Sequence, residues 1–376
     1  MLIQNSTPTV MDTRLSLFEW TPSELKQWLK DRGQPSYRSS QILQWVYLRG
    51  AKTFAEMTDL SKPLREEFSE LLSLETPPIE TAQRDPADDA VKILLRLSDQ
   101  EGVEAVCMRS YSSPVRTDPR TGGVQLEAEE KSDSYTLCVS TQAGCMFACR
   151  FCASGQLGLK RNLTVGEIIS QIIAFLREGK TVSRVVFMGT GEPLHNLEVL
   201  RRVIEILCSK EGLGFSPRRL TVSTVGLVPE IYRIAQEGWK IKPAISLHAA
   251  TDEKRAELVP IAKVYPLESL MDALRFYQRR NGRRISFEYL MIDAFNDSRK
   301  DADRLQKLCD GLVCHFNLIP YNPVPKAPFQ PSPPDKIEAF KSHLRRLGID
   351  TTVRYSRGRN IDAACGQLRL RYARSG

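Results

Sequence analysis

Residues 138–155 read CVSTQAGCMFACRFCASG, and three cysteines of this stretch, Cys145, Cys149 and Cys152, are spaced C-x3-C-x2-C. A run this tight brings three thiolates within bonding distance of one metal centre. A structural zinc site takes four protein ligands, yet no histidine or cysteine follows Cys152 in the next forty residues. A 4Fe–4S cluster held by three cysteines keeps one iron open to a small molecule. The spacing therefore favours an iron–sulfur cluster over a zinc knuckle.

The spacing also resembles the signature of the radical S-adenosylmethionine (SAM) superfamily, including an aromatic residue, Phe151, next to the last cysteine. This resemblance implies that the amino and carboxylate groups of SAM chelate the open iron. It implies two cofactors, a 4Fe–4S cluster and SAM. Such a cluster needs a reducing compartment. Residues 1–15 are polar and no apolar run could span a bilayer, so we expect a cytoplasmic protein without a membrane partner.

Downstream of the cysteines, strand-like and helix-like patterns alternate. Six strands are predicted at residues 135–140, 184–188, 219–223, 244–247, 285–291 and 315–319, with helices at 164–177, 197–208, 229–236, 267–279 and 298–308. Thr164 and Glu167 form a capping box at the start of the first helix. A further helix (335–347) and strand (351–355) follow. This alternation predicts an α/β fold, a partial (β/α)6 barrel with helices outside a parallel sheet.

Upstream of the cysteines, residues 16–75 read as a small helical module, with helices after Thr21 and at 37–47, 54–57 and 64–72. Lysine, arginine and aromatic residues are interleaved there, which favours an RNA-binding accessory domain; a cap that only packs on the main domain is the alternative. A β-hairpin is predicted from 91–97 and 103–108. Residues 112–133, rich in proline, glycine and glutamate, are expected to form an exposed, mobile loop.

These patterns divide the chain into four parts, with boundaries at 1–75, 76–133, 134–356 and 357–376. The full length of 376 residues allows about two domains. Lys and Arg number 53 against 45 Asp and Glu, a net charge of +8. This modest excess suits a polyanionic partner, although a solvated basic surface is the bland alternative.

Polar and glycine-rich motifs follow several predicted strands. In parallel barrels the ligand lies at the carboxyl ends of the strands. The motifs at these ends are MGTGEP (188–193), STVG (223–226), SLH (246–248) and PYNP (320–323). Each is weak alone, but their recurrence at successive ends indicates a ligand site. We assign His248 a structural hydrogen-bonding role rather than that of a general base.

The remaining cysteines fall into two groups. Cys365 lies in a short AACG loop near the C-terminus, a setting that would also suit an inert buried thiol. Four others, Cys107, Cys208, Cys309 and Cys314, are expected to be inert.

With these residues assembled, the chain resembles the bacterial dual-specificity RNA methyltransferases, which methylate carbon-2 of an adenine in 23S rRNA and in tRNA. The resemblance is nearly full-length, from the helix near residue 37 to residues 361–368, IDAACGQL. Its most specific parts are CVSTQAGC at 138–145, the cysteine triplet, and Cys365 in AACGQ. The two flanking cysteines are not features of radical SAM enzymes generally.

The resemblance implies a role for each of these residues. Cys365 accepts a methyl group from one SAM, a second SAM supplies the radical, Glu104 accepts the ring proton, and Cys138 attacks the Cys365 sulfur to release the product. SAM-contacting positions carried over are Gly191, Glu192, Ser223, Ser246, Leu247, His248 and Asn322. The 112–133 segment is an insertion between Glu104 and Cys138, so spacing does not fix the base; a rigid strand favours Glu104 over Glu127, Glu129 or Glu130. We expect a monomer served by an electron donor of the flavodoxin or ferredoxin kind.

Two other functions compete with this interpretation. Related antibiotic-resistance methyltransferases, which act on carbon-8 of the same adenine, share the triplet, both flanking cysteines and the IDAACGQL run. Arg357 and Gly358, together with the long N-terminal module, resemble the carbon-2 enzymes more closely. A non-catalytic iron–sulfur RNA-binding protein is the second alternative, but it gives no reason for Cys138 and Cys365 to lie together.

Overall fold

The structure is a computed structural model that describes residues 14–87, 89–112, 115–117, 124–126, 130–324 and 327–355. At residues 111, 112, 115–117, 124–126, 130–132 and 157 it describes the backbone but not the side chain. Cys365 and the rest of 356–376 lie outside the described residues.

A ten-stranded sheet forms the centre of the molecule, in the order β16-β15-β14-β13-β12-β11-β8-β5-β4-β3. Seven neighbouring strands run parallel: β8 (Glu130–Cys138), β11 (Val182–Phe187), β12 (Leu220–Thr224), β13 (Lys242–Ser246), β14 (Ile285–Met291), β15 (Cys314–Pro320) and β16 (Thr351–Val353). The outward-facing apolar side chains of these strands, such as Val185, Val222 and Ile245, are buried in the main hydrophobic core. The predicted partial barrel is confirmed.

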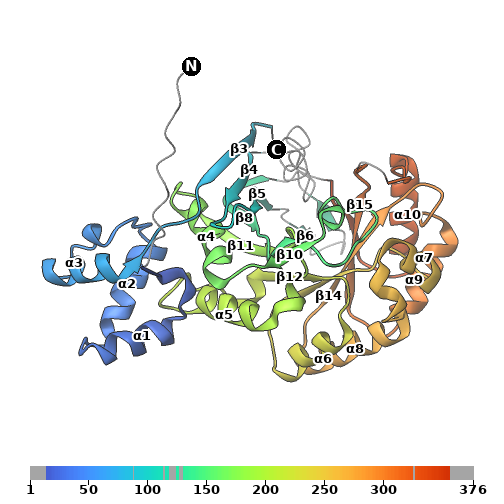
Figure 1. Cartoon of the computed structure of the whole chain (residues 1–376). Helices are drawn as coiled ribbons and strands as arrows, with labels where there is room; N and C mark the ends of the chain where they lie inside the picture. Colours follow the sequence, from blue (N-terminus) through green and yellow to red (C-terminus); the bar gives the residue numbers. More distant parts are fainter. Residues whose placement is uncertain are drawn as a thin grey trace, which may run out of the picture.

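Helices cover the outside of this curved sheet (Figure 1). They are α4 (Val165–Leu176), α5 (Leu197–Cys208), α6 (Val228–Gln236), α8 (Leu267–Asn281), α9 (Arg299–Leu308) and α10 (Pro334–Arg346). The predicted capping box opens α4, where the Thr164 side chain accepts from the Glu167 N–H. One short helix was not predicted: α7 (Asp252–Leu258), which Thr251 caps. Its sequence, DEKRAEL, is too short and polar for an apolar period to reveal it.

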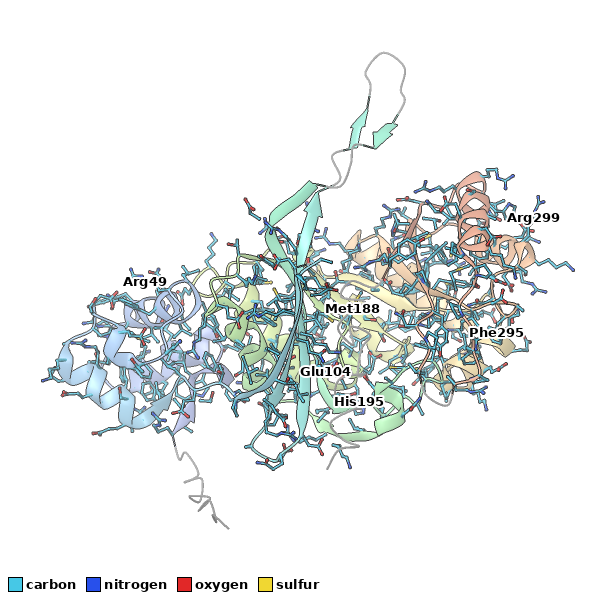
Figure 2. All side chains as sticks on the ribbon, turned by 90° about the horizontal axis from the view of Figure 1, so that it is seen from above. Arg49, Glu104, Met188, His195, Phe295 and Arg299 are labelled. Carbon is cyan, nitrogen blue, oxygen red and sulfur yellow. The ribbon has the colours of Figure 1, made fainter. Side chains whose placement is uncertain are left out.

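Three antiparallel strands extend the sheet beyond β8: β5 (Gly102–Ser112), β4 (Ala90–Arg96) and β3 (Ile79–Asp85). The β4–β5 pair confirms the predicted hairpin, whereas β3 was not predicted. The interpretation of 112–133 as loop throughout was wrong. Within it, β6 (Val115–Thr117) pairs antiparallel with β7 (Val124–Leu126), and β8 begins at Glu130. Figure 2 shows this ribbon projecting beyond the sheet. The two ends of this segment are held together because Ser112 at the end of β5 pairs with Glu130 at the start of β8.

The N-terminal residues form short elements: β1 (Leu15–Ser16), η1 (Leu17–Glu19), α1 (Pro22–Asp31), α2 (Tyr37–Tyr47), η2 (Phe54–Glu56), α3 (Lys62–Leu71) and β2 (Leu72–Ser73). Thr21 and Glu24 form a capping box at α1. The module packs on α4 and α5. The Arg177 guanidinium donates to the carbonyls of Ala51 and Leu74, and that of Arg202 donates to the Glu19 carbonyl.

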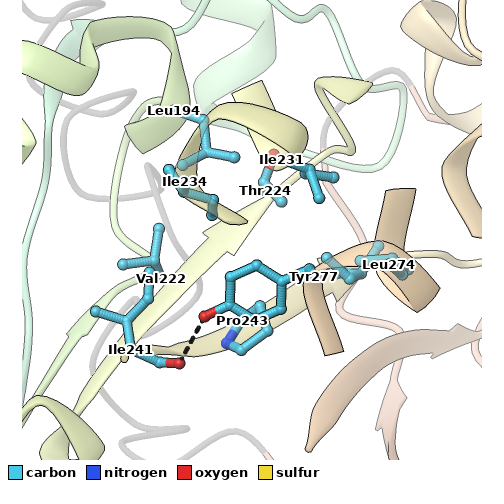
Figure 3. A pocket seen from close by; sticks show the side chains of 10 residues that line it. Leu194, Val222, Thr224, Ile231, Ile234, Ile241, Pro243, Leu274 and Tyr277 are labelled. Atoms are coloured by element: carbon cyan, nitrogen blue, oxygen red, sulfur yellow. Dashed lines mark hydrogen bonds between the residues drawn. The ribbon is translucent and has the colours of Figure 1, made fainter. Parts of the chain in front are cut away.

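A small apolar cavity lies between β12, β13 and helices α6 and α8 (Figure 3). Val222, Thr224 and Ile245 line it from the sheet, and the Tyr277 hydroxyl beside it donates to the Ile241 carbonyl at 3.0 Å. Its volume of about 10 Å³ is no larger than a water molecule needs. The cavity lies between the sheet and the helices outside it. The strand residues that line it therefore point outward, toward the helices.

Candidate active site

Ser223 and Ser246 lie on the inner face of the barrel at adjacent strand ends. Because strand residues alternate between faces, and Val222, Thr224 and Ile245 point toward the helices, Ser223 and Ser246 point the other way. Both are half-buried. The structure thus brings these two predicted SAM-contacting residues to one edge of the sheet.

Leu247 and His248 follow directly after the end of β13 and are held by hydrogen bonds to β14. Both backbone N–H groups donate to the Glu288 carbonyl, at 3.1 and 3.4 Å. His248 has a φ of +60°, its Nδ1 accepts from the Leu290 N–H at 3.2 Å, and its carbonyl accepts from Asn296 at 2.8 Å. Burial lowers the pKa of His248 to about 3, so the ring is neutral. These contacts agree with the structural role predicted for it.

The His248 ring also connects the strand end to the cysteine loop. The Phe151 ring meets it edge-on, with centroids 4.5 Å apart at 73°. Phe151 lies between Cys149 and Cys152, so the aromatic residue noted in the sequence packs the loop onto β13. The loop is thereby fixed over the same strand end that carries Ser246.

Gly191 and Glu192 lie in the turn after β11. Gly191 has a φ of +111°, and an added Cβ would lie 2.6 Å from the Gln142 Cβ, so only glycine fits. The Glu192 N–H donates to the Gln142 side chain at 2.9 Å. The buried Glu192 carboxylate accepts from the N–H groups of Leu194 at 3.0 Å and Val225 at 2.8 Å. Glu192 therefore joins the ends of β11 and β12.

The ionisation of Glu192 gives a pH-dependent prediction. Burial raises its pKa from 4.5 to about 7. Its contribution to stability is therefore present below pH 4.5 and is lost as the pH rises through 7, a change of at most about 3 kcal/mol. Glu192→Gln cannot titrate, so we expect its unfolding free energy relative to wild type to rise between pH 5 and pH 8. Urea unfolding at both pH values measures this, and an unchanged difference would contradict it.

The three clustered cysteines lie in a loop closed by a two-stranded antiparallel sheet that was not predicted, β9 (Gln142–Gly144) with β10 (Leu159–Asn162). The Cys145 N–H donates to the Gly158 carbonyl at 3.1 Å, and the Cys152 N–H donates to the Cys149 carbonyl at 3.1 Å. The β10 sequence, LKRN, is only four residues long and mostly polar, so it carries little strand signal. The pairing arises from the backbone and closes the loop at its base.

The chemistry of these side chains suits an iron–sulfur cluster. Burial raises the pKa of Cys145 to about 12 and that of Cys149 well above its usual value. The neighbouring thiols raise both pKa values further. Cys149 packs against Leu258 and Val259 in an apolar cluster. Soft sulfur donors in such a dry loop fit iron–sulfur ligation. Among the described residues, however, no three His, Cys, Asp or Glu side chains are grouped closely enough to hold a metal ion as they stand.

Gly144 sets the shape of this loop. Its φ is +87°, and an added Cβ would lie 1.8 Å from the Gly158 carbonyl oxygen. Gly144→Ala must therefore displace the β10 end of the loop, and we expect severalfold less iron per chain after anaerobic reconstitution. Gly282→Ala is the matched control, because Gly282 is in the left-handed helical region with φ +62° and ψ +27°, and no atom lies within 4 Å of the added Cβ. That change brings only about 1–2 kcal/mol of backbone strain. Equal iron content in the two variants would contradict this prediction.

Cys138 and Glu104 share the inner face of the sheet. Cys138 ends β8, where it pairs with Val106 of β5. Its neighbours Leu137 and Val139 face the helix-side core, as do Val103 and Ala105 around Glu104. Alternation therefore directs Cys138 and Glu104 to the opposite face, and both are buried. The Ser140 hydroxyl donates to the Glu104 carbonyl at 2.7 Å, fixing the end of β8 against β5.

Lys92 is a residue of this site that the sequence interpretation missed. Its ammonium lies 2.9 Å from the Glu104 carboxylate, and the side chains are 0% and 5% exposed. Lys92 pairs with Val106 across β4 and β5, in the same row as Cys138. The signal was a lysine inside the apolar run AVKILL, a place where an unpaired charge would be costly.

The other predicted site residues have mixed outcomes. Asn322 is half-buried just after β15. Cys365 lies outside the described residues, so its place beside Cys138 stays a prediction. Of the cysteines expected to be inert, Cys107 and Cys309 are buried, and Cys208 and Cys314 are partly so. Figure 2 shows Glu104, Met188 and His195 in the central part of the molecule, away from Arg49 at one end and Arg299 at the other.

Comparison with known proteins agrees with this architecture. A sequence profile described as Radical SAM superfamily matches residues 139–305, and one described as Ribosomal RNA large subunit methyltransferase N-terminal domain matches residues 15–74. A probable dual-specificity RNA methyltransferase RlmN of Desulforamulus reducens is 40% identical over 363 residues, covering 96% of this chain and 97% of its own. The Symbiobacterium thermophilum relative of that name is 41% identical over 355 residues, covering 93% and 90%.

A solved structure supports the same assignment. The crystal structure of a radical SAM methyltransferase from Sphaerobacter thermophilus is similar with a TM-score of 0.83 and 41% identity, covering 94% of this chain and 98% of that one. The barrel and its three-cysteine loop define a radical SAM enzyme, a class that uses a 4Fe–4S cluster and SAM. Within that class, the chain belongs to the RlmN family of dual-specificity RNA methyltransferases. No helix in the described part of the chain is long and apolar enough to cross a membrane.

Proposed function

We propose that this enzyme methylates carbon-2 of an adenine in 23S rRNA and in tRNA, by way of a methyl group carried on Cys365 and released by Cys138. The observation that carries the proposal is the common face of Cys138 and Glu104. The buried Cys138 thiol lies at the end of β8, seven residues before Cys145 of the cysteine loop. The buried Glu104 carboxylate lies on β5, the strand that pairs with β8. A radical SAM barrel alone requires neither.

The cofactors would be held by residues already described. Cys145, Cys149 and Cys152 would ligate the cluster, and the strand-end residues Gly191, Glu192, Ser223, Ser246, Leu247, His248 and Asn322 would contact SAM. When bound, the cluster and SAM supply the radical that activates the methyl group carried by Cys365. We propose two SAM molecules per turnover, since the methyl group and the radical come from separate cofactor molecules.

The chain's own residues complete the reaction. Glu104 would accept the proton displaced from carbon-2, because it is held on a paired strand and faces Cys138. The Cys138 thiolate would then attack the Cys365 sulfur, forming an S–S bond as the bond from that sulfur to the added carbon breaks; the carbon keeps the bonding electron pair and takes up a proton to become the methyl group. The resulting disulfide must be reduced before the next cycle. Dry surroundings protect both steps from competing water.

The surface of the N-terminal module supports RNA as the binding partner. Arg32 stacks over the Trp28 ring at 3.8 Å, and Arg49 stacks over the Trp45 ring at 4.2 Å. Both guanidinium groups belong to exposed residues, and such cation–aromatic surfaces suit RNA. These contacts favour an RNA-binding role over a simple cap. We propose a monomer in the cytoplasm, reduced by a protein of the flavodoxin or ferredoxin kind.

The test is anaerobic incubation of the reconstituted enzyme with SAM, reductant and either a 23S rRNA fragment or tRNA. We expect 5′-deoxyadenosine and a methyl group that mass spectrometry locates on carbon-2 of one adenine. A methyl group on carbon-8 would overturn the proposed position in favour of the antibiotic-resistance type of reaction. Intact cluster with RNA binding, but without 5′-deoxyadenosine or methylation, would favour the non-catalytic alternative.

A further inference from the structure

Helix α7 carries a buried cation that the proposed reaction does not use. The Arg255 side chain is 0% exposed. Its Nη2 donates to the Val225 carbonyl at 2.6 Å and to the Ser246 carbonyl at 3.4 Å. Val225 follows β12 and Ser246 ends β13, so the guanidinium spans two of the strand ends that form the proposed SAM site. Its Nε and Nη1 are buried and have no hydrogen-bond partner in the described part of the chain.

The same helix supports the cysteine loop. Leu258 lies three residues beyond Arg255, on the same side of α7. The Leu258 carbonyl accepts from the Arg150 N–H of the loop at 3.1 Å, and its side chain packs with Cys149 in one apolar cluster. Arg255 thus lies beneath the cysteine loop, between it and the ends of β12 and β13.

No carboxylate neutralises this guanidinium through an ion pair within the described ranges. The neighbouring Asp252 carboxylate instead accepts from the Leu267 N–H at 2.7 Å. Burial lowers the pKa of Arg255 to about 10, so the guanidinium stays charged at neutral pH. Burying a cation with two unsatisfied donor atoms is costly, so a negative charge placed close to Arg255 would stabilise this part of the fold.

We propose that Arg255 is the counter-charge of the three-cysteine cluster, stabilising its thiolate ligands and most of all its reduced state. The inference rests on the proposed ligation by Cys145, Cys149 and Cys152. The reduction potential of such clusters depends on net charge, burial and hydrogen bonds to sulfur. A fixed cation raises the potential, because reduction adds a negative charge near it. Arg255 is a positioning residue and not a catalytic one.

The test is a potentiometric titration of the full-length, anaerobically reconstituted protein without SAM, followed by electron paramagnetic resonance. We expect Arg255→Met to shift the midpoint potential to more negative values at full iron content, and Arg255→Lys to stay close to wild type. Arg150→Met is the matched control. Arg150 is a cation of the cysteine loop itself, but it is 47% exposed and paired with Glu257, so solvent screens it.

Each other outcome also decides the question. An Arg255→Met potential equal to wild type overturns the proposal, as does a shift that occurs only after SAM is added, which would assign the charge to the cofactor carboxylate. If Arg255→Met and Arg255→Gln assemble no cluster, the proposal stands provided that Arg255→Lys does, and falls if Arg255→Lys does not. Wild-type protein that assembles the cluster but methylates another atom overturns the proposed function alone. Wild-type protein without a cluster overturns both.

Discussion

Substituting Cys138 by alanine is expected to stop the enzyme once the carbon carried by Cys365 has joined the adenine, and so to leave RNA covalently attached to Cys365. The buried thiol at the end of β8 is the group we assign to attack the Cys365 sulfur. Without it the bond between that sulfur and the added carbon has no partner thiolate to displace it. Multiple turnover should fall by roughly 10³-fold or more, the scale of loss when a residue that forms a covalent bond in the reaction is removed.

The measurement is a denaturing gel of the variant after one anaerobic reaction, with mass spectrometry of the nuclease-trimmed peptide that contains Cys365. Cys107→Ala is the matched control. Cys107 is another buried cysteine, on the neighbouring strand β5, where it pairs with Leu137 and faces the helix-side core. We expect this variant to release methylated RNA at close to the wild-type rate and to trap none. Normal release of product by Cys138→Ala would contradict the role assigned to Cys138.

The barrel could be predicted because its signals are local. The strand β14 lies at the predicted residues 285–291 and helix α5 at 197–208, since each combines a strong apolar pattern with clear boundaries. The elements that were missed, α7, β3 and the β9–β10 pair, are short or polar. Their formation depends on a cap, a neighbouring strand or the closure of the cysteine loop. The cap of α7 is local but comes with too few apolar residues to be recognised, whereas the neighbouring strand and the loop closure are tertiary causes that no window of sequence contains.

The site shows the same division. The cysteine triplet and the motifs at the strand ends could be found because their residues are close together in sequence. Arg255 has no such signal, and the lysine within AVKILL is only a weak one, because a lysine or arginine is usually exposed. Only the packed structure shows that these two side chains are fully buried. Their burial places one positive charge beside Glu104 and another beneath the cysteine loop.

Removing the Lys92 ammonium is expected to produce the largest loss of stability in this site. Lys92→Met keeps the length and apolar stem of the side chain but takes away the cation 2.9 Å from the buried Glu104 carboxylate. Removing one partner of a buried ion pair typically costs about 3–5 kcal/mol. We expect a loss of that size in the free energy of unfolding, measured with urea. The double variant Lys92→Met/Glu104→Leu should recover much of it, since no buried charge then remains at the pair.

Lys336→Met is the matched control for this loss. Lys336 lies 2.6 Å from Asp293, a shorter distance than that of the buried pair, but the two side chains are 47% and 35% exposed. Exposed pairs contribute at most about 1 kcal/mol, so the comparison isolates burial from distance. If both lysine variants lose the same small amount, the Lys92–Glu104 pair is not held in a dry site. The position of Glu104 beside Cys138 would then have no fixed cation to maintain it, and its assignment as the proton acceptor would lose its structural basis.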